Sequence, residues 1–359
     1  MNHDMKVVKS DGKRVDINLD KIHRMVEKAC RHITGVSESL VEMNSGLQFF
    51  DGITTQEIQK ILVKSASDLI SLDNPNYQFV AARLLLFAIQ KQVFNTKWKD
   101  SEIYPPLIDI IEKNIHLNVY DKTILKQYSI LEIEQLDGYI RHGRDLDFTY
   151  AGLQQIVDKY LVQDRSTQHV FETPQFMYML IAMTLFNKYD KENRIDYVKR
   201  YYDAISTFKI NISTPIMAGV RTPLRQFASC VLVDVDDTLD SIFSSDTAIG
   251  KYVAQRAGIG INVGRLRGLG SRIRGGEVQH TGVIPFLKKF ESTVRCCTQN
   301  GVRGGSATVH FPIWHQEIED IIVLKNNKGT EDNRVRKLDY SIQMSKLFYK
   351  RFLNNEDIT

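Results

Sequence analysis

One cysteine of this chain stands where its thiol could take part in chemistry. Cys230 begins an apolar run, directly after a polar segment that contains Thr214, Arg221, Arg225 and Ser229. The hydroxyl groups of Thr214 and Ser229 are suited to hydrogen-bond phosphate or ribose oxygens. Judged from the residues alone, a lone cysteine is most often a small buried apolar side chain, and that interpretation stays open for Cys230.

Two glycine-rich segments follow this cysteine. Residues 264–277 hold four arginines among five glycines, and guanidinium groups such as those of Arg267 and Arg274 suit phosphate oxygens. A basic loop for RNA is the competing interpretation, although the loop lacks aromatic residues for base stacking. Residues 297–308 form a second loop, which by its composition alone is only expected to be mobile.

An aspartate and a glycine pair precede these loops. An aspartate before a helical run, such as Asp237, is most often an N-cap. The Gly258-Ile259-Gly260 sequence is a weak signal, because no full dinucleotide-binding fingerprint accompanies it. These glycines are better explained by close approach of a substrate to the backbone.

The first hundred residues carry lysines beside backbone features that favour anions. Lys9 follows a predicted strand, Lys21 lies in the first turn of a predicted helix, and Lys91 ends another helix. Free backbone N–H groups and the helix dipole favour a phosphate at a helix N-terminus. The residues alone nevertheless favour solvated surface charges over a triphosphate site, so both interpretations stay open.

Apolar periodicity predicts the elements that position these residues. The N-terminal module is predicted as a hairpin followed by four helices, the second of them from Ser39 to Phe50. The candidate N-caps of its first and third helices are Asn18 or Asp20 and Thr54 or Thr55. Residues 107–202 are expected to be mostly helical, with a buried helix over 175–186. From about residue 205 short strands alternate with helical segments, which predicts an α/β domain.

The bulk composition is that of a globular protein. The 359 residues are 43% hydrophobic and 25% charged, and the net charge of +4 gives no reason to expect nucleic acid as a partner. No apolar run is long enough to span a bilayer, and the N-terminus lacks the core of a secretory signal, so we expect a cytoplasmic protein without a membrane partner. Four cysteines without zinc-site spacing predict neither a disulfide scaffold nor a metal site.

Five separated motifs, in the same order along the chain, resemble those of the large (alpha) subunit of class Ia, aerobic ribonucleotide reductases. They are the N-terminal lysine pattern, Thr214 to Cys230, Asp237 to Asn262, and the loops 264–277 and 297–308. The resemblance implies a multidomain fold of α+β and α/β domains. It has an ATP-cone regulatory domain, a helical bundle with a β-hairpin cap, over 1–95, a helical domain over 96–205, and the first part of a ten-stranded α/β barrel over 206–359.

The resemblance also implies residue roles. Cys230 would be one of two cysteines that become a disulfide when the ribose 2′-hydroxyl leaves as water, a step that needs two electrons. The substrate would be held by Thr214, Ser229, Gly258, Gln299 and Arg303. An effector nucleotide of the specificity site would be held by Asp237, Leu239, Arg267 and Arg274. ATP or dATP would be held in the cone by Val7, Lys9, Asn18, Lys21, Thr55 and Lys91. The second loop would couple effector to substrate.

Two positions depart from the family pattern in the cone. Family members often have an acidic residue where this chain has Val15 and a histidine where it has Gln59. We therefore expect dATP inhibition to be weakened or absent, although nucleotide still binds.

The family's Asn-x-Cys-x-Glu motif, its tyrosine pair and its C-terminal cysteine pair do not occur in these residues. The resemblance therefore implies that the chain is a split or truncated N-terminal portion, inactive alone. Its implied partners are a complementary C-terminal fragment, a small (beta) subunit that carries a diiron-tyrosyl radical, a second alpha chain, and thioredoxin or glutaredoxin. A half-barrel would leave strand edges unpaired.

Other classes of protein remain open from the sequence. A non-catalytic nucleotide-binding regulatory fragment would share these motifs. A nucleic-acid-binding protein would use the arginine–glycine loops, with binding that depends on salt. A cobalamin-dependent or glycyl-radical reductase would share the barrel, but the match through the helical domain argues against it.

Overall fold

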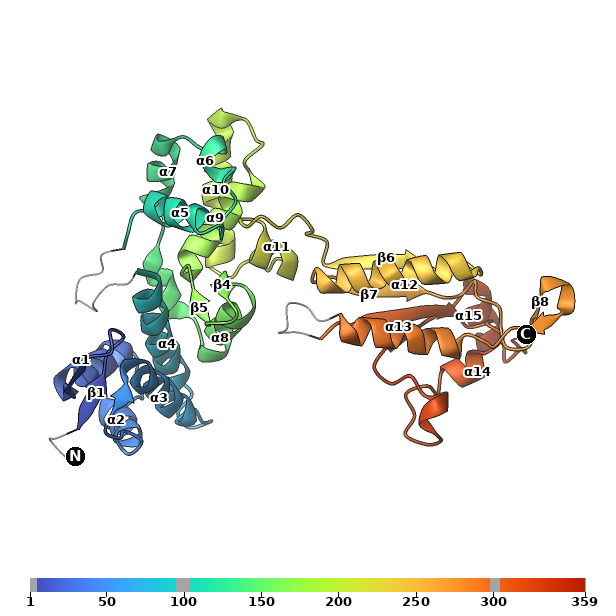
Figure 1. Cartoon of the computed structure of the whole chain (residues 1–359), viewed down its shortest axis with the longest axis horizontal. Helices are drawn as coiled ribbons and strands as arrows, with labels where there is room; N and C mark the ends of the chain where they lie inside the picture. The colour runs from blue at the N-terminus through green and yellow to red at the C-terminus, as the bar shows by residue number, and fades with distance from the viewer. Residues whose placement is uncertain (1–4, 95–103, 298–303, 359) are drawn as a thin grey trace. The chain divides into compact units, whose positions relative to one another are not determined.

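The computed structural model describes residues 5–94, 104–297 and 304–358 (Figure 1). The chain divides into two compact units, Met1–Arg225 and Gln226–Thr359. Residues 206–225, which the resemblance assigned to the barrel, are thus part of the first unit in the structure. The domain bounds at 95/96 and 205/206 stay predictions.

The first unit opens with a small three-stranded sheet and four helices. The strands are β1 (Lys6–Val8), β2 (Arg14–Asp16) and β3 (Ile53–Thr54), in the order β2-β1-β3. The helices are α1 (Leu19–Cys30), α2 (Glu38–Gly46), α3 (Thr55–Asp68) and α4 (Tyr77–Phe94). Helix α4 packs along α3 and α1, as Figure 1 shows in the blue part of the chain. The core between them is apolar and includes Val26, Ile53, Leu62 and Leu84.

Local sequence signals account for the helix ends in this module. Asn18 caps α1, because its side chain accepts a hydrogen bond from the Lys21 amide at 2.9 Å. Thr54 and Glu57 form a reciprocal capping box on α3. The predicted helix from Ser39 to Phe50 was too long. Helix α2 ends at Gly46, because the Gln48 and Phe49 amides bond the carbonyls three residues earlier instead of those four residues earlier.

The rest of the first unit is mostly helical, as the sequence predicts. Its helices are α5 (Leu107–His116), α6 (Ile124–Gln127), α7 (Ile130–Asp137), α8 (Tyr150–Lys159), α9 (Pro174–Leu185), α10 (Lys191–Ser206) and α11 (Thr214–Gly219). A 3-10 turn covers His142–Asp147, and β4 (Gln163–Asp164) pairs with β5 (His169–Val170). Helix α9 is buried along nearly its whole length, which confirms the prediction from its uniformly apolar residues.

A buried ion pair fixes the end of this unit. Arg221 and Glu172 both have fully buried side chains and form a salt bridge. Glu172 also accepts hydrogen bonds from the Tyr120 hydroxyl at 2.6 Å and the Val162 amide at 2.8 Å. Arg221 donates to the Met217 carbonyl at 2.5 Å, which ties the pair to α11. The guanidinium of Arg221 and the carboxylate of Glu172 therefore both have hydrogen-bond partners besides each other, as a buried ion pair requires.

A buried carboxyl in the same unit predicts a pH-dependent stability. Burial raises the pKa of Asp145 to about 7, and Gln175 donates to its Oδ1 at 2.8 Å. Because the unfolded pKa is about 4, this group stabilises the fold fully below pH 4 and loses that contribution as pH rises to about 7, at about 1.4 kcal/mol per pH unit. We expect Asp145→Asn to remove this dependence in urea unfolding between pH 4 and 8. The exposed control Asp147→Asn should keep it. Equal slopes for wild type and Asp145→Asn would contradict the prediction.

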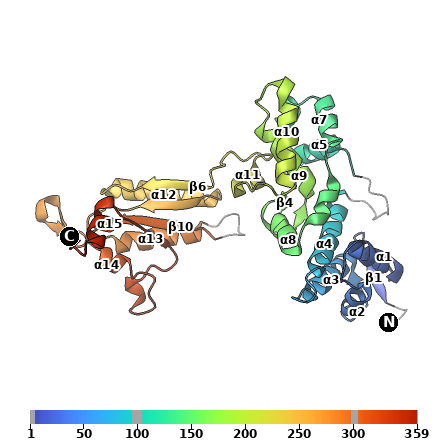
Figure 2. The ribbon, with the colours of Figure 1, turned by 180° about the vertical axis from the view of Figure 1, so that it is seen from behind.

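The second unit is a four-stranded parallel sheet with helices on one face. Its strands are β6 (Cys230–Asp234), β7 (Gly258–Asn262), β10 (Ala307–Pro312) and β11 (Asp339–Gln343), in the order β11-β10-β7-β6. Helices α12 (Leu239–Ala254) and α13 (Ile284–Cys296) pack together over this sheet (Figures 1 and 2). The smaller elements are β8 (Arg272–Ile273), β9 (Val278–Gln279), α14 (Ile318–Ile321), α15 (Lys346–Leu353) and 3-10 turns at Arg274–Gly276 and Glu331–Asn333.

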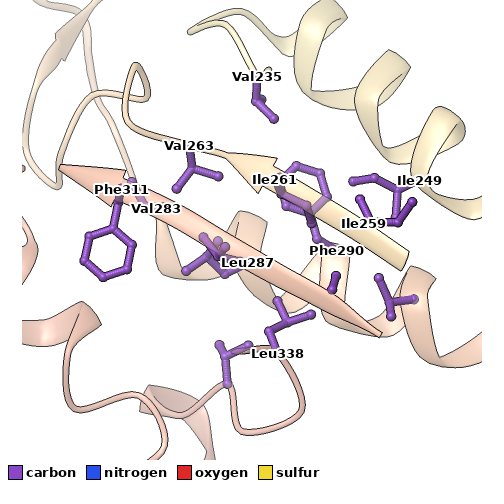
Figure 3. Packing of buried hydrophobic residues seen from close by; sticks show 14 of the residues in the cluster. Val235, Ile249, Ile259, Ile261, Val263, Val283, Leu287, Phe290, Phe311 and Leu338 are labelled. Carbon is purple, nitrogen blue, oxygen red and sulfur yellow. The ribbon is translucent and has the colours of Figure 1, made fainter. Parts of the chain in front are cut away.

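Alternation along the strands separates the two faces of this sheet. Ile259 and Ile261 of β7 point to the helices and meet Ile249 of α12 and Phe290 of α13, as Figure 3 shows. The next residues along each strand point the other way. On that second face Leu232 of the edge strand β6 is 82% exposed.

Candidate functional site

The predicted redox cysteine lies at the amino edge of the parallel sheet. Cys230 is the first residue of β6 and is exposed. It pairs in register with Gly258, the first residue of β7. The Gly258 amide donates to the Ser229 carbonyl at 2.8 Å, and the Ser229 hydroxyl lies 3.9 Å from the Cys230 sulfur. The structure thus brings together one thiol, one hydroxyl and one glycine of the predicted set.

The stem of the second glycine-rich loop reaches the same edge. The Ile259 amide donates to the Ser306 carbonyl at 3.2 Å, and a Cβ on Gly258 would lie 3.9 Å from the Ser306 hydroxyl. Gln299 and Arg303, the predicted substrate contacts in that loop, lie outside the described residues. Both glycines of the 258–260 pair lie within β7 rather than in a loop. A Cβ on Gly260 would lie 2.5 Å from the end of the exposed Leu232 side chain and 3.1 Å from the His310 Nε2 atom.

Two of the four predicted effector residues contact each other at the carboxyl ends of the parallel strands. Asp237 follows β6 and Arg267 follows β7, and the Arg267 guanidinium donates to the Asp237 carboxylate at 2.5 Å. The Arg267 amide also donates to Asp237, at 3.2 Å. The N-cap interpretation of Asp237 was wrong, because Thr238 caps α12 through the Ser241 amide. Leu239, also predicted for this site, begins α12 and is exposed.

The other arginines of the loop 264–277 differ in their contacts. Arg265 bridges Asp234 and Asp236, at 3.1 and 2.7 Å. Arg272 and Arg274 are exposed, and within residues 5–94, 104–297 and 304–358 their guanidinium groups have no hydrogen-bond or ion-pair partner. This edge therefore presents two uncompensated cations beside an Asp–Arg pair, an arrangement that favours a polyanion.

Cys230 lies at the amino ends of the parallel strands, and the Asp237–Arg267 pair lies beyond their carboxyl ends. The length of the strands therefore separates these two places. Five residues at about 3.3 Å each give roughly 16 Å along β6 or β7. Helix α13 begins after the arginine loop, residues 264–277, and ends at Cys296, just before the second glycine-rich loop. It is thus the covalent connection between the two glycine-rich loops.

The predicted cone residues lie at three places in the module. Val7 is buried in β1, and Val8 pairs with Thr54, so Lys9 and Thr55 both follow neighbouring parallel strands at one edge. Asn18 and Lys21 begin α1 at the other end of the hairpin, where the Ile17 amide bonds the Met5 carbonyl. Lys91 lies in the last turn of α4, and burial lowers its pKa. The Lys91 side chain is nevertheless exposed, so its interpretation as a solvated surface charge stays open.

The polar segment before Cys230 lies largely in the first unit. Thr214 is half-buried at the start of α11. Arg221, in the segment first singled out for chemistry, is instead the buried partner of Glu172, and Arg225 pairs with Asp121 at 2.6 Å. Within the described part of the chain, no helix could span a membrane, and no group of three or more His, Cys, Asp or Glu side chains could hold a metal ion.

Comparison with known proteins gives each region a counterpart. Residues 5–92 match the ATP cone domain, 146–225 the all-alpha domain of ribonucleotide reductase, and 228–359 the barrel domain of ribonucleotide reductase. Together they describe the class of protein: a ribonucleotide reductase chain with an ATP cone domain, an all-alpha domain and a match to the barrel domain.

Curated relatives align with the chain over nearly its whole length. The ribonucleoside-diphosphate reductase subunit alpha of Haemophilus influenzae is 52% identical over 360 residues, which cover 100% of this chain and 47% of the relative. The ribonucleoside-diphosphate reductase 1 subunit alpha of Escherichia coli is 51% identical, with 100% and 46% covered. The subunit alpha of Enterobacteria phage T4 is 44% identical, with 99% and 46% covered. The chain belongs to the ribonucleotide reductase alpha-subunit family and spans about half the length of these curated relatives.

Proposed function

We propose that this chain supplies the N-terminal part of the catalytic subunit of a cytoplasmic ribonucleoside-diphosphate reductase. The observation that carries the proposal is the contact among Cys230, Ser229 and Gly258 at one sheet edge, in a chain whose relatives are named for this activity. Thr214, Gln299 and Arg303 complete the proposed substrate contacts.

The proposed chemistry assigns Cys230 one half of a dithiol. When the ribose 2′-hydroxyl leaves as water, two thiols supply two electrons and two protons, a C–H bond replaces the broken C–O bond, and one S–S bond forms. Cys30, Cys296 and Cys297 do not lie on β6 or its neighbouring strands. We assign the second thiol, the thiyl-radical cysteine and the re-reducing cysteine pair to the remaining part of the alpha subunit, whichever polypeptide carries it. Thioredoxin or glutaredoxin would restore the dithiol.

The proposed effector site comprises Asp237, Leu239, Arg267 and Arg274 at the carboxyl edge. The exposed Arg274 would hold phosphates of a nucleoside triphosphate. The same phosphates would compete with the Asp237 carboxylate for Arg267. Removing one charge-assisted hydrogen bond costs about 1.5–3 kcal/mol, so Arg267→Ala should weaken dTTP binding by roughly 10- to 100-fold. Binding of dATP to the cone, measured in the same sample, is the internal control.

We predict weakened dATP inhibition because the cone departs from its family at position 59. The Gln59 amide donates to the Leu84 carbonyl at 2.8 Å, so it is held against α4 and carries no charge for a phosphate. Loss of one such contact corresponds to about a tenfold higher inhibitory concentration. A dATP titration of CDP reduction by the assembled enzyme measures it. Gln59→His should restore inhibition, and strong inhibition of the wild-type enzyme would contradict the prediction.

The function is tested by assembling the enzyme. The chain, the remaining part of the alpha subunit and a radical-generating small subunit are mixed with CDP, ATP and a dithiol reductant, and we expect dCDP to form and alpha chains to dimerise. The chain alone with the small subunit should give no product. Turnover without the remaining part, or an assembled complex without turnover, would overturn the proposal.

A further inference from the structure

A short turn distant in sequence holds the base of the arginine loop. β10 leads into residues 313–317, which precede α14. In this turn His315 and Glu317 are both only 7% exposed. Neither residue belongs to the proposed substrate, effector or cone sites.

Glu317 joins two points that are far apart along the loop. Its Oε2 atom accepts a hydrogen bond from the Leu269 amide at 3.0 Å and another from the Val283 amide at 2.9 Å. These amides lie on either side of the hairpin of β8 and β9, which carries Arg272 and Arg274. One buried carboxylate therefore closes the segment 269–283 at its base.

His315 fixes both the turn and the start of the loop. Its Nδ1 atom accepts from the Glu317 amide at 3.1 Å, so its Nε2 is the atom that donates to the Leu266 carbonyl, at 2.9 Å. Leu266 precedes Arg267 directly. The imidazole thus connects the effector arginine to the same turn that holds Val283.

Two glycines, Gly268 and Gly282, allow the backbone at the two ends of the loop to approach this turn closely. A Cβ on Gly268 would lie 2.6 Å from the Gln316 Oε1, and one on Gly282 would lie 2.6 Å from the Glu317 Oε1. The backbone at Gly282 also has a φ of +86°, which favours glycine. Both ends of the loop therefore approach the turn more closely than a side chain would allow.

We propose that His315 and Glu317, here called the loop clamp, are positioning residues. They hold the arginine loop, residues 264–277, in place for a nucleoside triphosphate. The proposal rests on the proposed effector site. An exposed glycine-rich loop loses conformational entropy when it orders around a ligand, and the clamp has already removed part of that freedom. Because Val283 is also the N-cap of α13, the clamp fixes the helix that ends at the second loop.

The test compares Glu317→Ala, Glu317→Gln and the control Glu319→Gln, an exposed position on α14, in the full chain. Hydrogen exchange is followed at the Leu269 and Val283 amides, and dTTP and dATP affinities are measured by calorimetry. We expect Glu317→Ala to speed exchange at both amides by about tenfold or more and to weaken dTTP binding by roughly tenfold. Binding of dATP at the cone should be unchanged.

The conservative variant separates positioning from general destabilisation. The amide oxygen of Glu317→Gln can still accept both bonds, without the charge, so its exchange and dTTP affinity should fall between wild type and alanine. Protection of the Ile261 and Val309 amides checks that the sheet is intact. If the alanine variant fails to fold, the glutamine variant decides.

Unchanged exchange at Leu269 and Val283, or faster exchange with unaltered dTTP affinity, would overturn the proposal. A wild-type chain that binds dTTP only at the cone would overturn the proposed effector site and its link to the clamp. The exchange data would then still report on the clamp itself.

Discussion

Replacing Arg221 by methionine is expected to lower the free energy of unfolding of the first unit by about 3–5 kcal/mol. The reason is the carboxylate that the change leaves behind. Glu172 is fully buried, and without its partner its donors among the described residues are the Tyr120 hydroxyl and the Val162 amide. Urea unfolding followed by circular dichroism measures the loss, since this unit is largely helical.

Two control variants make the Arg221 prediction specific. The double variant Arg221→Met with Glu172→Gln removes the uncompensated charge and should recover much of the lost stability. Arg200→Met breaks an exposed pair with Asp196 and should cost less than about 1 kcal/mol. A loss of that small size for Arg221→Met would show that the buried pair contributes little to this unit.

Replacing Cys230 by serine is expected to abolish CDP reduction by the assembled enzyme, with a loss of about three orders of magnitude or more, as for residues that form covalent bonds in a reaction. Serine has nearly the size of cysteine and places a hydroxyl beside Ser229 and Gly258. It cannot form the S–S bond. Product is measured as dCDP under saturating effector and reductant. Nucleotide binding by the variant should be unchanged.

Cys296→Ser is the matched control for this prediction. That thiol is also exposed, but it lies at the end of α13, where it contacts the Thr293 carbonyl at 3.5 Å. We expect it to retain activity. If the Cys230 variant kept near wild-type turnover, this chain would not supply the redox thiol.

Features with a local signature could be predicted from the sequence. The N-cap Asn18 lies within three residues of the amide that it accepts from. The strand that begins at Cys230 and the buried helix α9 follow from uninterrupted apolar residues. The order of the domains followed from the resemblance, since composition alone predicted only an α/β region after mostly helical segments.

Contacts between distant residues had no such signature. Asp237 was expected to cap a helix, yet its partner Arg267 lies 30 residues away. Arg221 finds Glu172 at a separation of 49 residues, and Glu317 reaches Leu269 at 48. Arg221 lies between Val220 and Thr222, and these neighbours give no local sign of a buried pair.

The exposed face of β6 that carries Cys230 also makes the thiols of this chain distinguishable by alkylation. Cys230 is exposed on the edge strand, whereas burial raises the pKa of Cys30 to about 12, so iodoacetamide should modify Cys230 far faster. Peptide mapping separates it from Cys296. The alkylation rate of Cys230 then acts as a footprint: any molecule that covers this face slows the reaction, and one that binds elsewhere leaves it unchanged.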